Sequence, residues 1–214
     1  SHALDYDDVD GVMGGHPTVP VLPMAIALGE QLDSSGRDVL LAYVVGFETE
    51  VRLSRGVNYH HYEKGWHPTA TLGAFGAAAA AARLLGLGET HTAVALGLAA
   101  SFASGLKANF GTMTKPLHVG HSAKNGLLAA FLAREGFTAN PGVFEHRQGF
   151  LNVFNGPGTF DAARVLERWA EPLEILDPSV GLKQYPCCGS THPAVNMMLR
   201  LVREEGVRPE VVER

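Results

Sequence analysis

The stretch GTMTKPLHVGHSAKNG, residues 111–126, gathers cationic and imidazole side chains within a chain that is otherwise rich in Ala, Leu and Gly. Pro116 places Lys115 just before a predicted helix, whose free amides and dipole attract anions. An ammonium group and a helix start directed at one point could hold a carboxylate. The alternative is an exposed lysine, but the small apolar segments 95–106 and 127–133 on either side favour a pocket.

We expect a different role for the histidines of the same stretch. His118 and His121 are spaced i, i+3 and therefore share one face of the predicted helix. A metal site would need a third ligand, which the sequence does not clearly provide, so we predict that no metal binds there. We expect these histidines to pack against a neighbouring subunit.

Other histidines stand directly before prolines. His16 lies in the glycine-rich segment GGHPTVP, and His67 lies in GWHPT at a predicted helix start. Histidine carries protons near neutral pH, so both positions are candidates for acid–base chemistry. The alternatives are a loop residue bonded to the backbone for His16 and a residue bonded to free helix amides for His67. We expect His60 and His61, in NYHHYEKG, to face solvent or an interface.

The segment HALDYDD, residues 2–8, supplies the carboxylates of Asp5, Asp7 and Asp8. Clusters of this kind often cap a following element. A carboxylate here could instead orient a histidine or act as a base. We assign such a role to Asp5 and expect structural roles for Asp7 and Asp8.

The cysteines exclude several kinds of site. Cys187 and Cys188 are adjacent, so they cannot form a disulfide framework, and a four-iron cluster would need three or four cysteine ligands. Their spacing to His192 fits no common zinc site. We therefore predict chemistry without a metal or a cofactor. A strained vicinal disulfide is the alternative to free thiols, and for Cys187 we favour a buried free thiol.

Composition bounds the class of protein. The 214 residues are 46% hydrophobic and 18% charged, which is typical of a folded chain with a substantial core. The net charge of −5, with no basic stripe, excludes nucleic acid as an expected partner. The apolar segment 71–87 is rich in Ala and contains Arg83, so we predict a buried helix and no membrane partner. No secretory signal is visible, which together with the free thiols predicts a cytoplasmic protein.

Apolar spacing predicts helices over most of the chain. The expected ranges are 19–33, 39–53, 68–85, 90–104, 116–134 and 193–205. Strand signals are weak and limited to LEIL, residues 173–176, and EVVER, residues 210–214. The fold class is therefore mainly α, built from long helices that bury one another.

Collinear motifs then indicate a family. They are HALDYDD (2–8), GHPTVPVLPMAIALGE (15–30), GFETEVRLSRG (46–56), GWHPTATLGAFGAAAAAARLLGL (65–87), ALGLAASFASGL (95–106), GTMTKPLHVGHSAKNGLLAAFLAREGFT (111–138) and KQYPCCGSTHPAVNMML (183–199). Together they resemble the MmgE/PrpD family, which includes 2-methylcitrate dehydratase, cis-aconitate decarboxylase and iminodisuccinate epimerase. The resemblance implies an all-helical domain over residues 1–206, lacking its first helices, followed by the start of a truncated α+β lid at 207–214. It also implies a homodimer formed through the helical domain.

The resemblance assigns roles residue by residue. Cys188 stands where the cis-aconitate decarboxylases have a histidine, and Val9 stands where they have a threonine, so both departures argue against decarboxylation. The implied catalytic residues are Asp5, His16 and Lys115, and the implied substrate-binding residues are His67, Lys183 and Cys188.

The expected function follows from these roles. The favoured expectation is a cofactor-independent hydro-lyase that acts on a small di- or tricarboxylate, in the manner of 2-methylcitrate dehydratase. Cations would hold the carboxylates while a base and an acid move protons. The alternatives are an epimerase or decarboxylase of a related polycarboxylate, or a truncated domain that dimerises without turnover.

Overall fold

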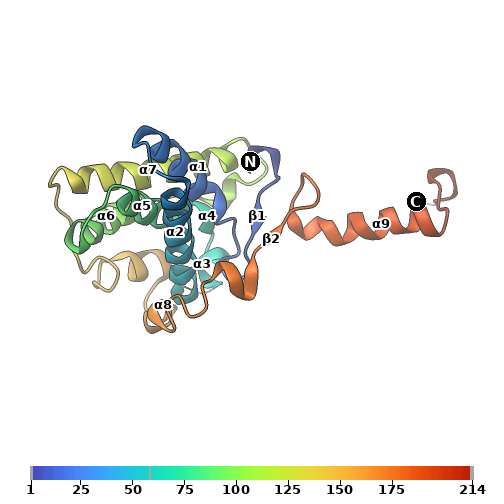
Figure 1. Ribbon diagram of the computed structural model, residues 1–214. Coiled ribbons are helices and arrows are strands. Elements are labelled where there is room, and N and C mark those ends of the chain that lie inside the picture. Colours follow the sequence, from blue (N-terminus) through green and yellow to red (C-terminus); the bar gives the residue numbers. More distant parts are fainter. Residues whose placement is uncertain (1, 58, 213–214) are drawn as a thin grey trace.

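The computed structural model describes residues 2–57 and 59–212 and confirms a mainly α fold (Figure 1). Each predicted helix overlaps an observed one, and Leu72 divides the predicted helix at 68–85 into α4 and α5. The elements in this part of the chain are α1 (Thr18–Gln31), α2 (Gly36–Val57), α3 (His60–Glu63), α4 (Pro68–Thr71), α5 (Gly73–Leu84), α6 (Glu89–Phe102), α7 (Thr114–Arg134), α8 (Ala163–Leu166), α9 (His192–Glu204), β1 (Asp8–Val9) and β2 (Gly181–Leu182).

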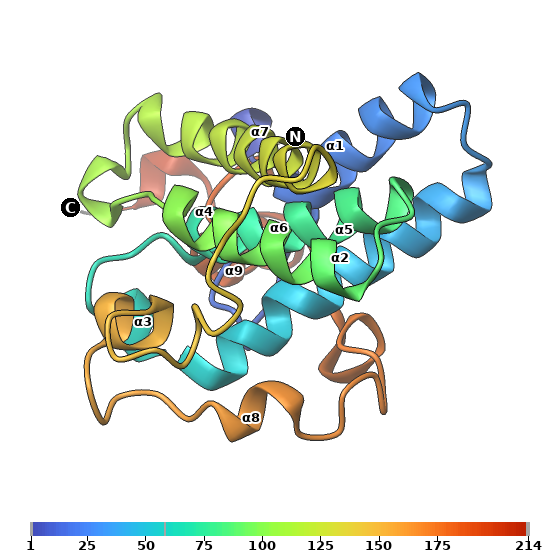
Figure 2. The ribbon, with the colours of Figure 1, turned by 90° about the vertical axis from the view of Figure 1, so that its left-hand side faces the viewer.

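Helix α5 is the centre of the helical body, between α2 and α7 (Figure 2). Its alanines, Ala77–Ala82, are all buried; alanine favours helix and lets neighbouring helices approach closely. A Cβ at Gly46 of α2 would lie 2.6 Å from the carbonyl oxygen of Gly76, and one at Gly126 of α7 would lie 2.4 Å from the Cβ of Ala77. The close contact of these backbones makes the body a firm support for the loops that precede α1, α4 and α7.

The α5 segment was expected to be a buried helix, and it is. Within residues 2–57 and 59–212, none of the helices combines the length and apolar character that a membrane span requires.

A short antiparallel ladder joins distant parts of the chain. Asp8 pairs with Leu182 and Val9 pairs with Gly181, so β1 lies against β2 (Figure 1). The Asp8 carboxylate also accepts hydrogen bonds from the backbone N–H of Thr18 (3.0 Å) and from its hydroxyl (2.7 Å). Asp8 therefore has the structural role expected of it, because it fixes β1 to the start of α1.

The predicted strands at 173–176 and 210–214 are wrong for the residues described. Ile175–Ser179 forms a kinked helical turn, and the backbone N–H of Glu174 donates to Glu48 Oε2 (2.7 Å) instead of to a strand. Pro209–Val211 forms a 3₁₀ turn, which the fixed φ of proline suits. Residues 213–214 lie outside the described part of the chain.

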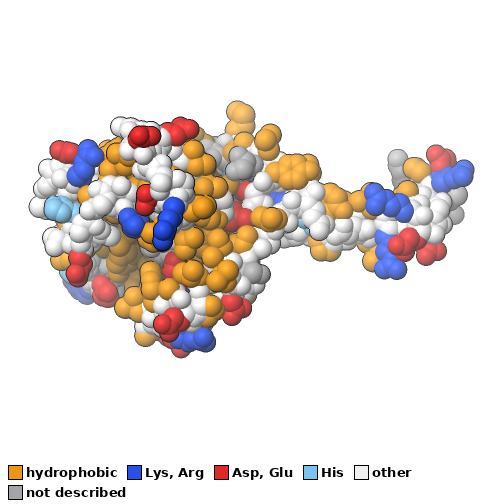
Figure 3. Space-filling model, viewed as in Figure 1, with side chains coloured by type: hydrophobic (Ala, Val, Ile, Leu, Met, Phe, Trp, Pro, Cys, Tyr) orange, Lys and Arg blue, Asp and Glu red, His pale blue; other side chains and the backbone are white. Residues whose placement is uncertain are grey.

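Helix α9 extends away from the helical body (Figure 1). Its side chains, including Met197, Met198 and Val202, are exposed or only half-buried. Figure 3 shows this extension as a slender arm with apolar side chains along it and charged ones towards its far end.

Candidate active site

One cluster of titratable side chains is built from several segments of the chain. These are the acidic N-terminal segment, the loop before α1, the residue before α4 and the segment after β2. We call His2, Asp7, His16, His67 and Lys183 the histidine cluster. All are buried except His16, which is half-buried. The imidazole of His2 lies 5.0 Å from that of His16 and 5.9 Å from that of His67, measured between ring centroids.

Asp7 is the charged centre of this cluster. One carboxylate oxygen lies 2.7 Å from the Lys183 ammonium, and the other accepts a hydrogen bond from His2 Nδ1 and lies 3.7 Å from His16 Nδ1. Burial alone would raise the pKa of Asp7, but the hydrogen bonds from His2 and Lys183 outweigh burial and hold this pKa well below its usual range. Asp7 is therefore an ionised acceptor inside the protein.

The β1–β2 ladder delivers Lys183 to this position. The backbone N–H of Lys183 donates to the carbonyl of Asp7 (3.3 Å), which continues the ladder beyond β2. Lys183 also forms an ion pair with Asp5, whose backbone has a φ of 55° in the left-handed region that aspartate tolerates. Burial lowers the pKa of Lys183, but the bonds to Asp5 and Asp7 act more strongly, and the net result is a raised pKa. Lys183 is thus a cation shared by two carboxylates.

His16 is arranged as a base. Its Nδ1 lies 2.6 Å from the carbonyl oxygen of Asp8, and its backbone N–H donates to Thr69 Oγ1 (3.1 Å). A carbonyl oxygen only accepts, so Nδ1 carries the proton and the neutral ring has its lone pair at Nε2. Burial lowers the pKa of His16 to about 4, against the opposing charge of Asp7. At neutral pH this half-exposed histidine therefore presents an unprotonated nitrogen.

His67 and His118 form a row of imidazoles between the histidine cluster and α7. Nδ1 of His67 lies 3.3 Å from Nδ1 of His118, so one of these nitrogens donates and the other accepts. Burial, followed by the nearby charges of His2, His118 and Lys115, lowers the pKa of His67 to about 2. His118 thus contacts a residue of the cluster, and its expected place at a subunit interface stays a prediction.

Lys115 lies at the edge of this row, in the first turn of α7. Its ammonium is 5.3 Å from the centre of the Phe110 ring, and Phe110 packs edge-on against His67 at 4.9 Å between ring centres. Lys115 is half-buried and forms no ion pair with any residue in the described ranges. It therefore retains a positive charge for an external anion.

Cys188 differs from these residues in its exposure. It is exposed, whereas Cys187, for which a buried free thiol was favoured, is free but only half-buried. A Cβ at the adjacent Gly189 would lie 3.5 Å from Cγ2 of Val9. Val9, one of the two departures from the decarboxylases, therefore lies beside Gly189, the residue that follows the other, Cys188.

His2 and Asp7 are the members of the cluster to which the sequence analysis gave no chemical role. The signal was present in HALDYDD, where a histidine precedes an aspartate by five positions. The tight turn through His2–Leu4 and the left-handed Asp5 bring the two side chains together. Periodicity does not reveal such a turn.

The ligand atoms of His2, Asp7 and His16 lie within 4.8 Å of one another, which is a spacing that could suit a metal ion. However, the Lys183 ammonium is already bound to Asp7 at 2.7 Å and would repel a cation at this point. We therefore interpret the cluster as acid–base machinery, and the absence of a metal remains a prediction.

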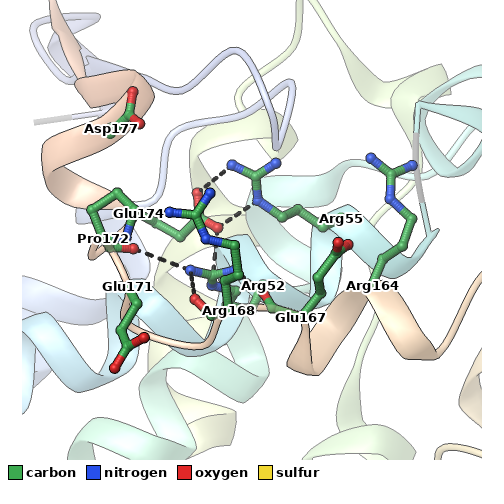
Figure 4. A pocket seen from close by; sticks show the side chains of 9 residues that line it. All are labelled: Arg52, Arg55, Arg164, Glu167, Arg168, Glu171, Pro172, Glu174 and Asp177. Atoms are coloured by element: carbon green, nitrogen blue, oxygen red, sulfur yellow. Dashed lines mark hydrogen bonds and ion pairs between the residues drawn. The ribbon is translucent and has the colours of Figure 1, made fainter.

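A second charged cluster, which was not expected from the sequence, joins α2 to the loop at 167–174. We call Glu48, Arg52, Arg55 and Glu174 the arginine cluster, and Figure 4 shows Arg52, Arg55 and Glu174. Arg52 donates to Glu48 (2.8 Å) and to the carbonyls of Glu167 (2.6 Å), Arg168 (2.8 Å) and Pro172 (3.1 Å). The adjoining cavity of about 220 Å³ is lined by both acidic and basic side chains. This cluster fixes the loop at 167–174 to α2.

His61 corrects another expectation. It was expected to face solvent or an interface, but it is 1% exposed and bonds Asn155 Oδ1 (3.0 Å) and Thr71 Oγ1 (2.8 Å). Burial lowers the pKa of His61 to about 4. Both ring nitrogens are occupied, so His61 is a structural histidine.

The all-helical body thus holds a buried cluster of imidazole, carboxylate and ammonium groups. The protein-family model for the MmgE/PrpD N-terminal domain matches residues 1–163. The chain belongs to the MmgE/PrpD family, as its motifs indicated.

Curated relatives match almost the whole chain. It is 38% identical over 221 residues to a cis-aconitate decarboxylase of Homo sapiens, with 97% of this chain and 44% of the relative covered. The cis-aconitate decarboxylase of Mus musculus is 40% identical over 215 residues, with coverages of 98% and 43%. A cis-aconitate decarboxylase of Aspergillus terreus is 34% identical over 222 residues, with coverages of 99% and 45%. The chain thus spans less than half the length of these relatives.

Proposed function

We propose that the full-length natural protein is a lyase that acts on a small tricarboxylate. The observation that carries this proposal is the combination of an unprotonated His16 Nε2 with the nearby cation Lys183 in one buried cluster. Anionic substrates need cations, and lyase chemistry needs a base and an acid beside the bond that breaks. The relatives, which are named cis-aconitate decarboxylases, support the same class of reaction and substrate.

Each side chain has a role in this proposal. Lys115 and His67 hold substrate carboxylates at the α7 side of the cluster, where the Lys115 ammonium has no ion-pair partner among the described side chains. His16 Nε2 exchanges a proton with the substrate. Asp5 holds Lys183 in place, and Lys183 provides positive charge to the substrate-facing side.

Decarboxylation is the first candidate reaction because the relatives that match the chain carry that name. Dehydration is the second candidate. The observation that favours it is the pair of residues Val9 and Cys188, which are near each other through Gly189. They provide an apolar side chain and a thiol, where the resemblance implies a hydroxyl and an imidazole in decarboxylases. Dehydration of 2-methylcitrate, the favoured expectation from the sequence, has no support from the named relatives.

One assay separates the candidates. The purified full-length protein is incubated with cis-aconitate and, in parallel, with 2-methylcitrate, while released carbon dioxide and alkene absorbance are recorded. We expect carbon dioxide from cis-aconitate. Alkene formation from 2-methylcitrate without carbon dioxide would identify a hydro-lyase. Deuterium uptake from heavy water with neither change would identify an epimerase, and no reaction with any polycarboxylate would refute the proposal.

A further inference from the structure

His2 is placed as a reactive group that the proposed roles do not use. Its side chain is 4% exposed, and its Nδ1 bonds the ionised carboxylate of Asp7. A carboxylate only accepts, so Nδ1 must carry a proton. Carboxylate–imidazole pairs of this kind fix the tautomer and the direction of the ring, which leaves Nε2 as the nitrogen available for chemistry.

His2 Nε2 is buried and has no hydrogen-bond partner within the described residues. Leaving a buried polar atom without a partner costs about 1–3 kcal/mol, so such atoms call for a physical explanation. The rings of His16 and His67 both lie near His2, at 5.0 and 5.9 Å between centroids. His67 Nε2 is likewise buried and without a partner in this part of the chain. His2 therefore lies beside the proposed base, with a ring nitrogen that no described side chain occupies.

His2 and His16 differ in what supports Nδ1. His16 faces the neutral carbonyl of Asp8 at 2.6 Å, whereas His2 faces the negative charge of Asp7. A carboxylate stabilises an imidazolium more than a carbonyl does, because it opposes the charge directly. The cluster thus holds one histidine whose Nδ1 is bonded to a carboxylate and one whose Nδ1 is bonded to a carbonyl, with Asp7 at 3.7 Å from the latter.

We propose that His2 is the proton donor of the reaction and that Asp7 is its positioning residue; this rests on the proposed lyase function. In a decarboxylation, the bond to the departing carboxylate breaks, carbon dioxide leaves, and the freed electron pair takes the His2 Nε2 proton onto carbon. In a dehydration, His16 removes the proton on carbon, the carbon–oxygen bond breaks, and the departing hydroxyl takes the His2 proton as water. In either case His2 ends neutral, and solvent returns its proton.

Charged and titratable groups surround His2. They are the carboxylate of Asp7, the ammonium of Lys183 on the other oxygen of Asp7, and the imidazoles of His16, His67 and His118. A bound tricarboxylate would add negative charge to this set.

Turnover by variants of the full-length protein tests the assignment. His2→Gln is expected to lower kcat at least about 100-fold with little change in KM, since only the proton donor is lost. His91→Gln, on an exposed part of α6, is the matched control and keeps wild-type activity. Added imidazole is expected to restore part of the activity of His2→Ala in proportion to its protonated fraction. A His2→Gln enzyme with kcat within about threefold of wild type would overturn the assignment.

The Asp7→Asn enzyme tests the positioning role by its pH profile. An acid catalyst must be protonated, so the rate falls as the pH rises through its pKa. Without the Asp7 charge the imidazolium is less stable, and the alkaline limb of kcat is expected to move to lower pH. A limb that stays in place with a uniformly lower rate would show that Asp7 has only a structural role.

Calorimetry provides a readout that does not depend on turnover. Citrate binding to the full-length protein is measured at pH 8 in phosphate and in Tris, which differ in ionisation enthalpy. Wild type is expected to take up about one proton per site, and His2→Gln is expected to lose that uptake. Equal uptake in both proteins would refute the acid role. A wild type that turns over no tricarboxylate would refute the proposed function alone, because the proton count still tests His2.

Discussion

The histidine cluster and the arginine cluster are both buried and charged, yet they differ in how completely their polar atoms are paired. Arg52 in the arginine cluster is paired with the carboxylates of Glu48 and Glu174 and with backbone carbonyls. Figure 4 shows its contacts with Glu174 and with the loop. In the histidine cluster, Nε2 of His2 and of His67 have no partner among the residues described. A fully paired buried charge holds structure, whereas unpaired nitrogens beside paired ones indicate groups that act on something else.

Replacing His16 gives the largest effect expected from this contrast. If the reaction is a dehydration, His16→Gln in the full-length protein removes the base but preserves much of the side-chain volume. We expect kcat to fall by a factor of about 10²–10⁴, with the free energy of unfolding changed by less than about 1 kcal/mol. Steady-state kinetics and urea unfolding measure the two quantities. A variant that loses both stability and activity would show that His16, like the arginine cluster, holds the structure together.

Breaking the arginine cluster should have the opposite pattern. Arg52→Ala leaves the buried carboxylate of Glu48 without its cation, whereas Glu174 keeps Arg55. Removing one member of a buried pair costs about 3–5 kcal/mol. Thermal or urea unfolding should show this loss. The control is Arg164→Ala, which removes an exposed arginine beside the same cavity and should change stability by less than about 0.5 kcal/mol. Equal effects of the two variants would contradict the structural role of Arg52.

Lys115 tests the proposed contact between the protein and a substrate carboxylate. Its ammonium has no ion-pair partner in the described structure, so Lys115→Ala should leave stability nearly unchanged. We expect KM for a tricarboxylate to rise about 10- to 100-fold, which corresponds to the loss of one charge-assisted contact. Lys124→Ala, on the exposed surface of the same helix, is the control. A full-length enzyme with an unchanged KM would exclude Lys115 as a carboxylate clamp.

Glu50 is a buried group with unpaired atoms that belongs to neither cluster. It is fully buried, and neither carboxylate oxygen has a partner within the described chain. Burial, followed by the charges of Asp8 and Asp10, raises its pKa well above the ordinary value. The folded protein therefore binds more protons than the unfolded chain between the ordinary and the raised pKa, so this contribution to stability falls as pH rises through that interval. Glu50→Gln should gain on the order of 1 kcal/mol relative to wild type at pH 8, with the difference vanishing near pH 4. Urea unfolding at both pH values checks the sign, and a larger gain at the lower pH would refute it.

Much of the helical body could be predicted from sequence. Apolar spacing and the run Ala77–Ala82 are local signals, and helices appear where these signals stand. His16 and Lys183 were also named in advance, and the structure brings both to Asp7. Their meeting depended on a two-residue ladder between segments that are far apart in the chain, and such a short pairing has no local pattern.

The arginine cluster was missed for a related reason. Glu48 and Arg52 are spaced i, i+4, a pattern that usually indicates a solvent-exposed helix face. Here the loop at 167–174 covers that face and supplies carbonyls to Arg52. His61 was misjudged in the same way, because Asn155, its partner, is distant in sequence. Burial of a polar residue depends on what covers it, and single-sequence patterns do not record that.

The ladder between β1 and β2 also sets an order of events during protein synthesis. Residues 2–134 contain the long helices of the body and can pack while later residues are still being added at about 5–20 per second. Until Lys183 emerges, Asp5 and Asp7 lack their shared cation. The helical body of the nascent chain can therefore fold before the histidine cluster is assembled. Asp5 and Asp7 gain their shared cation only after most of the described chain has left the ribosome.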